Sequence, residues 1–210
     1  MPDGAKKIPF LDKPCGANFS AACYCPQRPM KPLPPGCLQR RLRPSDESAL
    51  LEFFHSHSRE TVFQRYHYLF TEMSHQRALS LLGVDQQRDV ALAIVETTTS
   101  GEYIHAIARY YTEPTGNVAE VAFVVRESKR RLGLATRLLQ ALGEIAEEHA
   151  LVWLRAQILQ DNYPMRALLS RYAPRIHPMP YADVVEYFVP VASLALHHSR
   201  HRGCAGAVTS

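Results

Sequence analysis

Residues 118 to 136 hold the side chains of this chain that are best suited to chemistry. One carboxylate, Glu120, lies within the otherwise apolar run Val118–Val125. A basic turn follows, in which Arg130 and Arg131 precede Gly133 and the start of an amphipathic segment. A carboxylate can accept a proton, and a basic helix start can bind phosphate. The segment therefore predicts an acid–base group beside a site for a pyrophosphate-bearing cofactor.

The phosphate site is predicted at a helix N-terminus. About four backbone N–H groups lack partners there, and the helix dipole adds roughly half a positive charge. Gly133 lets the backbone approach a ligand because it has no Cβ, and Ala135 is the next smallest choice. The pattern R-x-x-G-x-A is neither a P-loop nor the dinucleotide fingerprint G-x-G-x-x-G. The alternative is a basic helix start that binds no ligand.

Glu120 is the candidate general base. In a strand it shares a face with Ala122 and Val124, and burying an isolated carboxylate is unfavourable, so a partner or a function is expected. The alternatives are a solvated glutamate, or one paired with Arg109 across a hairpin. A base suits an amine substrate, because an amine with a pKa of about 10.4 is almost wholly protonated near neutral pH.

A mixed α+β fold is expected to position these residues. The hydrophobic patterns predict strands at 37–43, 90–96, 103–111, 118–125, 151–159 and 184–189, and helices at 45–57, 58–82 (broken), 134–149 and 162–172. The turn signal at 113–117 predicts a hairpin. A long helix joins strands 118–125 and 151–159, so these should pair in parallel through a right-handed crossover. We expect a mixed, mostly antiparallel sheet flanked by helices, with a central βαβ unit.

Three segments are expected along the 210-residue chain. Residues 1–37 hold eight of the fifteen prolines and are interpreted as a flexible Pro- and Cys-rich arm. Residues 38–192 form the predicted domain, and 193–210 a polar tail. The net charge of +4 is too mild to indicate nucleic acid. Without an apolar run of about 18 residues or a signal-peptide core, no membrane contact and a cytoplasmic location are expected.

The cysteines do not show a familiar metal or disulfide pattern. They are Cys15, Cys23, Cys25, Cys37 and Cys204, and the first four have the spacing C-x7-C-x-C-x11-C. Structural zinc sites usually have paired C-x2-4-C knuckles, and an odd number of cysteines argues against a disulfide framework. Free thiols on the arm are expected, and a metal or redox site is the alternative.

The sequence that contains these residues resembles the GNAT superfamily of acyl-CoA-dependent N-acyltransferases. The family motif [QR]-x-x-G-x-[GA] corresponds to the residues from Arg130 to Ala135. Residues 40–190 also resemble the catalytic domain of the bacterial Pat-type protein lysine acetyltransferases. The matching segments are RPSDE at 43–47, ARY at 108–110, AEVAF at 119–123 and DNYPMR at 161–166.

The resemblance implies acetyl-CoA as a co-substrate and assigns its contacts. The pyrophosphate is expected on the amides of Arg130, Arg131, Leu132, Gly133, Leu134, Ala135 and Thr136, and the pantetheine and thioester along Phe123, Val124 and Val125. Asn162 is expected near the pantetheine, with helix capping as an alternative or additional role. Glu120 corresponds to the glutamate taken as general base.

The resemblance leaves the leaving-group acid open. Many relatives have a tyrosine at the position that aligns with Leu169, where it protonates the departing thiolate. This chain has no tyrosine there, and Tyr172, about one turn away, is not assigned the role. A thiol pKa of about 8.5 allows the thiolate to leave without a strong acid.

The implied acceptor is a protein lysine, for example on an acyl-CoA synthetase. It is expected to bind against the first two helices and the 113–117 hairpin. The residues expected at this surface are Arg59, Arg65, Tyr66, His67 and His75, whereas Phe63 and Phe70 are expected to pack internally. The alternatives are a small-molecule amine (polyamine or amino-acid-like) acceptor, and a non-catalytic acyl-CoA-binding sensor. The sequence leaves the acyl-chain preference, the regulation and the oligomeric state open.

Overall fold

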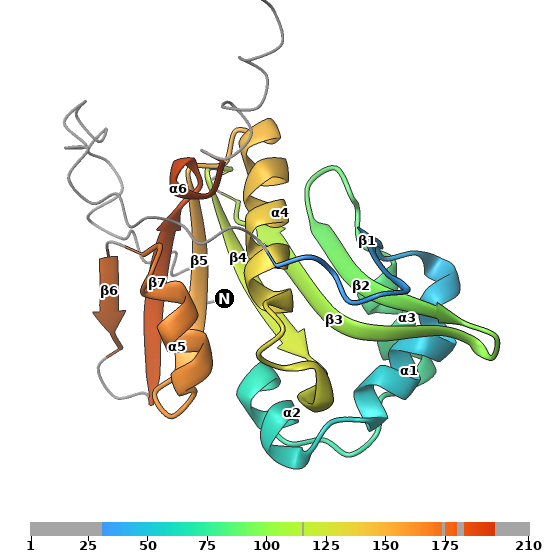
Figure 1. The fold of residues 1–210 in the computed structure, drawn as a ribbon. Coiled ribbons are helices and arrows are strands. Elements are labelled where there is room, and N and C mark those ends of the chain that lie inside the picture. The colour runs from blue at the N-terminus through green and yellow to red at the C-terminus, as the bar shows by residue number, and fades with distance from the viewer. Residues whose placement is uncertain (1–30, 115, 174, 180–182, 196–210) are drawn as a thin grey trace, which may run out of the picture.

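A seven-stranded sheet with helices on both faces forms the framework of the protein in a computed structural model (Figure 1). The structure describes residues 31–114, 116–173, 175–179 and 183–195. The strands are β1 (Cys37–Arg41), β2 (Val90–Thr98), β3 (Gly101–Thr112), β4 (Val118–Val125), β5 (Trp153–Leu159), β6 (Arg175–Pro178) and β7 (Val184–Pro190). The helices are α1 (Glu47–His55), α2 (Arg59–Tyr66), α3 (His75–Leu82), α4 (Leu134–Glu148), α5 (Tyr163–Leu169) and α6 (Ala192–Ala195). Two 3-10 turns, η2 (Pro44–Asp46) and η3 (Glu127–Lys129), precede α1 and α4.

The strand order is β1-β2-β3-β4-β5-β7-β6. Among the described strands only β4 and β5 pair in parallel, and α4 connects them. The predicted α+β class, the mostly antiparallel sheet and the central βαβ unit are thus confirmed. The prediction missed β6, because the sequence RIHP is too short to show alternation and ends in proline.

The two faces of the sheet carry separate hydrophobic cores. Alternation along β2 sends Val90, Leu92 and Ile94 to the core under α4, and the intervening residues to the core under α1, α2 and α3. Helix α4 buries the stripe that its sequence predicts, which includes Leu134, Leu138, Leu139 and Leu142. The sheet is therefore covered on both sides, and the site must open at a strand end or between strands.

The helices before β2 differ from the predicted boundaries. The 45–57 region begins with the turn η2, and α1 starts only at Glu47. The carboxylate of Asp46, instead of Ser45, accepts hydrogen bonds there, from the N–H of Arg43 and the guanidinium of Arg40. The 58–82 region is two helices, as its broken pattern indicates. Both of these helices, α2 and α3, have a serine N-cap.

Both described ends of the chain contact α4 (Figure 1). Leu33 packs against the core under α4, and the carbonyl of Lys31 accepts a hydrogen bond from Arg137. At the other end Leu194 packs on Gly143. Residues 1–30 and 196–210, which contain Cys15, Cys23, Cys25 and Cys204, lie outside the described residues. No helix in the described part of the chain is both long and apolar enough to cross a membrane.

Candidate active site

β4 and β5 frame the candidate active site. They pair only between Val118–Glu120 on β4 and Trp153–Arg155 on β5. Beyond Glu120, residues 121–125 have a strand partner only in β3 among the described residues, while β5 continues its pairing with β7. The two strands diverge toward the bottom of Figure 1. An opening therefore forms in the middle of the sheet, with Glu120 and Arg155 at its closed end.

The loop before α4 has the shape of an anion site. Arg131 and Gly133 have left-handed backbones, with φ of 63° and 84°. Gly133 stands at the N-cap of α4 and makes no side-chain cap, so the first N–H groups of the helix lack a capping side chain. A Cβ at Gly133 would lie 3.7 Å from Lys31, so the backbone angle, more than space, requires glycine. Uncapped amides and the helix dipole together favour phosphate.

A cleft of about 810 Å³ runs from this loop into the opening between the strands. It is lined by ten of the eleven residues predicted to bind the cofactor: Phe123, Val124, Val125, Arg130, Arg131, Gly133, Leu134, Ala135, Thr136 and Asn162. The eleventh, Leu132, is 41% exposed and is not part of the lining. The structure thus brings these residues together, and their contacts with a cofactor stay a prediction.

The charge of the cleft fits coenzyme A, which carries several phosphate groups. Seven of the 21 lining residues are cationic and none is acidic. The residues predicted to bind the cofactor did not include four of these cations: Lys31, Lys129, Arg137 and Arg171. Lys129 and Arg137 flank the motif and could have been found from it. Lys31 and Arg171 come from distant segments, and no local pattern indicates them.

Arg130 links the phosphate loop to α2. Its Nη2 donates to Oγ1 of Thr61 at 2.6 Å, and Thr61 donates to Oε1 of Glu127 at 2.6 Å. Glu127 also accepts from the backbone N–H of Ser58 at 2.9 Å. The hydrogen bonds from Thr61 and Ser58 lower the pKa of Glu127 to about 2. They fix α2 as one wall of the cleft.

Asn162 has the capping role that the sequence suggests as an alternative. Its side-chain oxygen accepts a hydrogen bond from the N–H of Met165 at 3.3 Å, at the start of α5. It also lines the cleft, so capping and ligand contact are compatible. Leu169, which occupies the position of the leaving-group tyrosine, is fully buried. None of the described residues lining the cleft is a tyrosine.

Glu120 is an accessible carboxylate held by an arginine of the neighbouring strand. Its side chain is 49% exposed, and its Oε2 accepts from Nη2 of Arg155 at 3.0 Å. The same guanidinium lies 3.0 Å from Glu113 and 3.3 Å from Glu186, so it gathers three carboxylates. The pairing with Arg109, one alternative from the sequence, does not occur among the described ion pairs.

Glu120 lies beside the cavities and not in their walls. Neither the cleft nor a second pocket has it in its lining. Ala122, two residues farther along the same face of β4, lines the second pocket, and Val124 lines both cavities. The carboxylate is therefore at the closed end of the opening, on the face of the sheet that carries α1 and α2.

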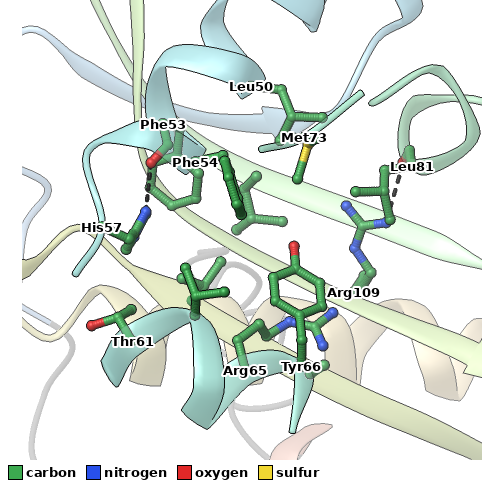
Figure 2. A pocket seen from close by; sticks show the side chains of 14 residues that line it. Leu50, Phe53, Phe54, His57, Thr61, Arg65, Tyr66, Met73, Leu81 and Arg109 are labelled. Carbon is green, nitrogen blue, oxygen red and sulfur yellow. Dashed lines mark hydrogen bonds between the residues drawn. The ribbon is translucent and has the colours of Figure 1, made fainter. Parts of the chain in front are cut away.

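The second pocket adjoins the cleft on the α1 and α2 side (Figure 2). Thr61, Arg65 and Val124 line both cavities, so the two meet at these residues. Much of the remaining wall is apolar, with Leu50, Phe53, Phe54, Val62, Met73, Leu81, Ile107 and Ala122. A group seated in this pocket would be adjacent to the end of the cleft at Val124.

The predicted acceptor surface is only partly reproduced. Arg65 and Tyr66 line the second pocket, whereas Arg59, His67 and His75 line neither cavity. Phe70 packs as expected, with its ring 4.9 Å from that of Phe54. The expectation for Phe63 is wrong, because this residue of α2 is 40% exposed.

Comparison with known proteins agrees with this architecture. Residues 39–172, well over half of the chain, match the family described as acetyltransferase (GNAT) domain. The GNAT domain of PAT from S. lividans has 22% identity over 72% of this chain and 89% of that chain, with a TM-score of 0.64. RimL, a ribosomal alpha-N-protein acetyltransferase in complex with coenzyme A, has 15% identity, 79% and 99% coverage and a TM-score of 0.60.

A third similar structure is a chimera of the spermidine N-acetyltransferase SpeG from Vibrio cholerae and hSSAT. It has 10% identity over 76% of this chain and 98% of that chain, with a TM-score of 0.57. At these identities the structural likeness shows the fold alone. The names of these proteins indicate different acceptors, so the fold does not select one.

The sheet that opens between β4 and β5, with a basic cleft at the start of α4, defines an acyl-CoA-dependent N-acetyltransferase. The chain belongs to the GNAT acetyltransferase family. Acetyl-CoA is the co-substrate of this family, and the lining of the cleft is compatible with it in charge and in backbone geometry.

Proposed function

We propose that this protein transfers the acetyl group of acetyl-CoA to a primary amine, with Glu120 as the general base. The observation that carries the proposal is the junction of the basic cleft with the smaller pocket at Val124. A donor held along β4 and an acceptor held against α1 and α2 would meet there. Glu120 lies at the closed end of the same opening, where it can receive a proton.

The proposed reaction is a direct transfer. The amine nitrogen attacks the carbonyl carbon of the thioester, a C–N bond forms, and the C–S bond breaks with its electron pair remaining on sulfur. The proton from nitrogen passes to Glu120, because an amine with a pKa of about 10.4 must be deprotonated to attack. The departing thiolate has a conjugate-acid pKa of about 8.5 and can leave without a strong acid.

Water is expected to relay the proton to Glu120. Val124 is four positions beyond Glu120, which is about 13 Å along a strand at about 3.3 Å per residue. This separation is too long for direct transfer from an amine beside Val124. Arg155 fixes Oε2 of the carboxylate, while Oε1 makes no hydrogen bond to the described residues. A held carboxylate with one accessible oxygen suits a base that acts through water.

The acceptor that we propose is a lysine side chain of a protein, as the resemblance to the Pat-type enzymes implies. The 22% identity with the GNAT domain of PAT from S. lividans is compatible with this choice without selecting it. An amino-acid-like small amine is the second candidate. Two arginines in the acceptor-side pocket favour a carboxylate near the amine.

The test is an acetyl-CoA consumption screen against pooled proteins and small amines, with mass spectrometry of the products. The proposal predicts release of coenzyme A together with an N-acetylated amine. Acetylation of protein lysines would favour the first candidate, and acetylation only of small amines the second. Failure to bind acetyl-CoA in calorimetry would refute the proposal, and binding without any acetylated product would indicate a non-catalytic sensor.

A further inference from the structure

The small pocket beside the cleft combines apolar walls with two guanidinium groups. Arg65 comes from α2 and Arg109 from β3, and no acidic residue is among the lining side chains. Its interior holds about 30 Å³ for the centres of water-sized groups, and one such group needs about 10–15 Å³. The pocket therefore has room for a small polar group.

Arg109 is a buried cation without a described counter-ion. Its side chain is only 3% exposed. Nη1 donates to the carbonyl of Leu81 at 3.2 Å and to the hydroxyl of Tyr111 at 2.9 Å, and both partners are neutral. None of the ion pairs in the described part of the chain includes Arg109. Burying an unpaired charge is costly, so this position calls for an anion.

Arg65 places a second positive charge beside the first. Its guanidinium carbon lies 4.9 Å from the centre of the Tyr66 ring, and the described residues offer it no hydrogen bond or ion pair. Burial, and then the proximity of Arg109, lower the pKa of this guanidinium. Figure 2 shows Arg65, Tyr66 and Arg109 toward one side of the pocket, with His57 and Thr61 toward the other.

The histidine of the pocket does not balance these charges. Burial lowers the pKa of His57, and its Nδ1 lies 2.5 Å from the carbonyl of Phe53, so it is a neutral donor at physiological pH. Glu120 is close enough to affect Arg65 but is paired with Arg155 outside the pocket. Among the described residues that line the pocket, no acidic side chain balances the two guanidinium groups.

We propose that this pocket binds a carboxylate of the acceptor between Arg65 and Arg109, while the acceptor amine points past Val124 toward the thioester. The inference rests on the proposed acetyltransferase function and specifies its substrate class: amines that carry a carboxylate a few bonds or one residue away. A polyamine would place an ammonium group beside two arginines with no acid in the wall, so it is excluded. The carboxylate can belong to a free amino acid or to an acidic residue next to a target lysine.

Matched acceptors test the proposal. The first set is lysine, lysinamide and cadaverine. All three have the amine, but the carboxylate of lysine is neutralised in lysinamide and absent from cadaverine. The second set is a pair of peptides with lysine next to aspartate or asparagine. Coenzyme A release gives kcat/KM for each. We expect the carboxylate-bearing member to be preferred by about 10- to 100-fold, the range for hydrogen bonds to charged groups. A preference in the first set identifies a free amino acid, and one in the peptide set an acidic neighbour.

Variants locate the effect in the pocket. Arg65→Gln and Arg109→Gln should each remove most of the carboxylate preference, chiefly through KM for the acceptor, while Arg109→Lys should restore part of it. Arg88→Gln is the matched control, because this exposed arginine lines neither cavity. If circular dichroism shows that Arg109→Gln is unfolded, Arg65→Gln, at a half-buried position, tests the proposal alone.

A binding measurement separates failure of this inference from failure of the proposed function. Calorimetry with N-acetyl-lysine and N-acetyl-lysinamide measures binding to the pocket without turnover. If the acid binds more tightly than the amide, and Arg65→Gln removes this difference, the inference is supported even when the protein is inactive. Equal kcat/KM within each matched set, or equal binding of acid and amide, overturns the carboxylate site. Acetyl transfer that persists in that case leaves the acetyltransferase function intact.

Discussion

Glu120 is the residue on which the proposed chemistry depends most directly. Glu120→Gln keeps the side-chain shape but removes proton acceptance, so we expect kcat to fall by about 10²- to 10⁴-fold, the usual contribution of a general base. The Kd for acetyl-CoA should change less than twofold, because Glu120 is not in the lining of the cleft. Steady-state kinetics and calorimetry on the same preparations measure both.

Glu186→Gln is the control for Glu120→Gln. It removes a carboxylate from the same guanidinium, that of Arg155, but on β7 and away from the opening. Its kcat should stay near that of the wild type. Full activity in Glu120→Gln would remove the base assignment, whereas an equal loss in both variants would point to disturbance of Arg155.

At the same scale, the sequence predicted those site residues that are close together in the chain. The run from Arg130 to Thr136 carries its own signal, because a glycine with positive φ and a helix start are local features. Arg65 was expected at the acceptor surface, but the sequence has no signal that pairs it with Arg109. They come together only because α2 packs over β4, the neighbour of β3, and an arginine in a strand pattern does not reveal its missing counter-ion.

Among the elements, α4 depends on close contact with α6. A Cβ on Gly143 would lie 2.4 Å from Cβ and 2.8 Å from Cδ1 of Leu194. We expect Gly143→Ala to lower the free energy of unfolding by about 1–3 kcal/mol, because overpacking outweighs the helix propensity of about 1 kcal/mol that alanine adds. Urea denaturation measures the change. Glu147→Ala, at an exposed position of α4, should alter stability by less than about 0.5 kcal/mol.

The contact between α2 and η3 should depend on pH. The pKa of Glu127 is lowered to about 2 in the folded protein, below the value of about 4.3 expected in the unfolded chain. Its contribution to stability is thus fully present above the unfolded pKa and is lost as the pH falls toward 2. The stability difference between wild type and Glu127→Gln should therefore be larger at neutral pH than near pH 3. A difference that is independent of pH would contradict this role.

The boundaries of helices and strands were predicted best where the hydrophobic pattern is long. Strand β4 coincides with the predicted range, and α4 differs by one residue at its end. The segment between α2 and α3 was harder, because Phe70 packs against the core without belonging to a helix. Tertiary packing determines such segments, so local periodicity does not identify them.

For the whole molecule, Arg155 connects parts of the sheet that are distant in the sequence. Its guanidinium contacts Glu113 after β3, Glu120 on β4 and Glu186 on β7. Arg155→Met should leave three carboxylates close together and lower the free energy of unfolding by about 1–3 kcal/mol. The loss should shrink at high salt, because salt screens the repulsion that involves the exposed Glu120. Denaturation at low and high salt measures this, with Arg155→Lys as the charge-retaining control.

The fold class could be predicted from the sequence, but the opening between β4 and β5 could not. Hairpin signals and a long crossover helix determine an α+β sheet with one parallel pair. The divergence of β4 and β5 after Glu120 leaves no mark in either strand's hydrophobic pattern, since residues 121–125 are apolar like those of a fully paired strand. The opening follows from β5 pairing farther along β7 than along β4, a property of the assembled sheet.

The divergence of β4 and β5 also makes the sheet a pair of half-sheets joined along a short seam. In the described chain, three residue pairs of β4 and β5 form that seam. A pantetheine arm lying along β4 would serve as a surrogate strand, covering an inner edge that is otherwise open to another extended chain. The donor would then be a structural component as well as a reactant, and ligand at about 100 times its Kd would add about 2.7 kcal/mol to stability. Depletion of acetyl-CoA would lower the protein's resistance to proteolysis and aggregation, so its lifetime would follow the supply of its own substrate.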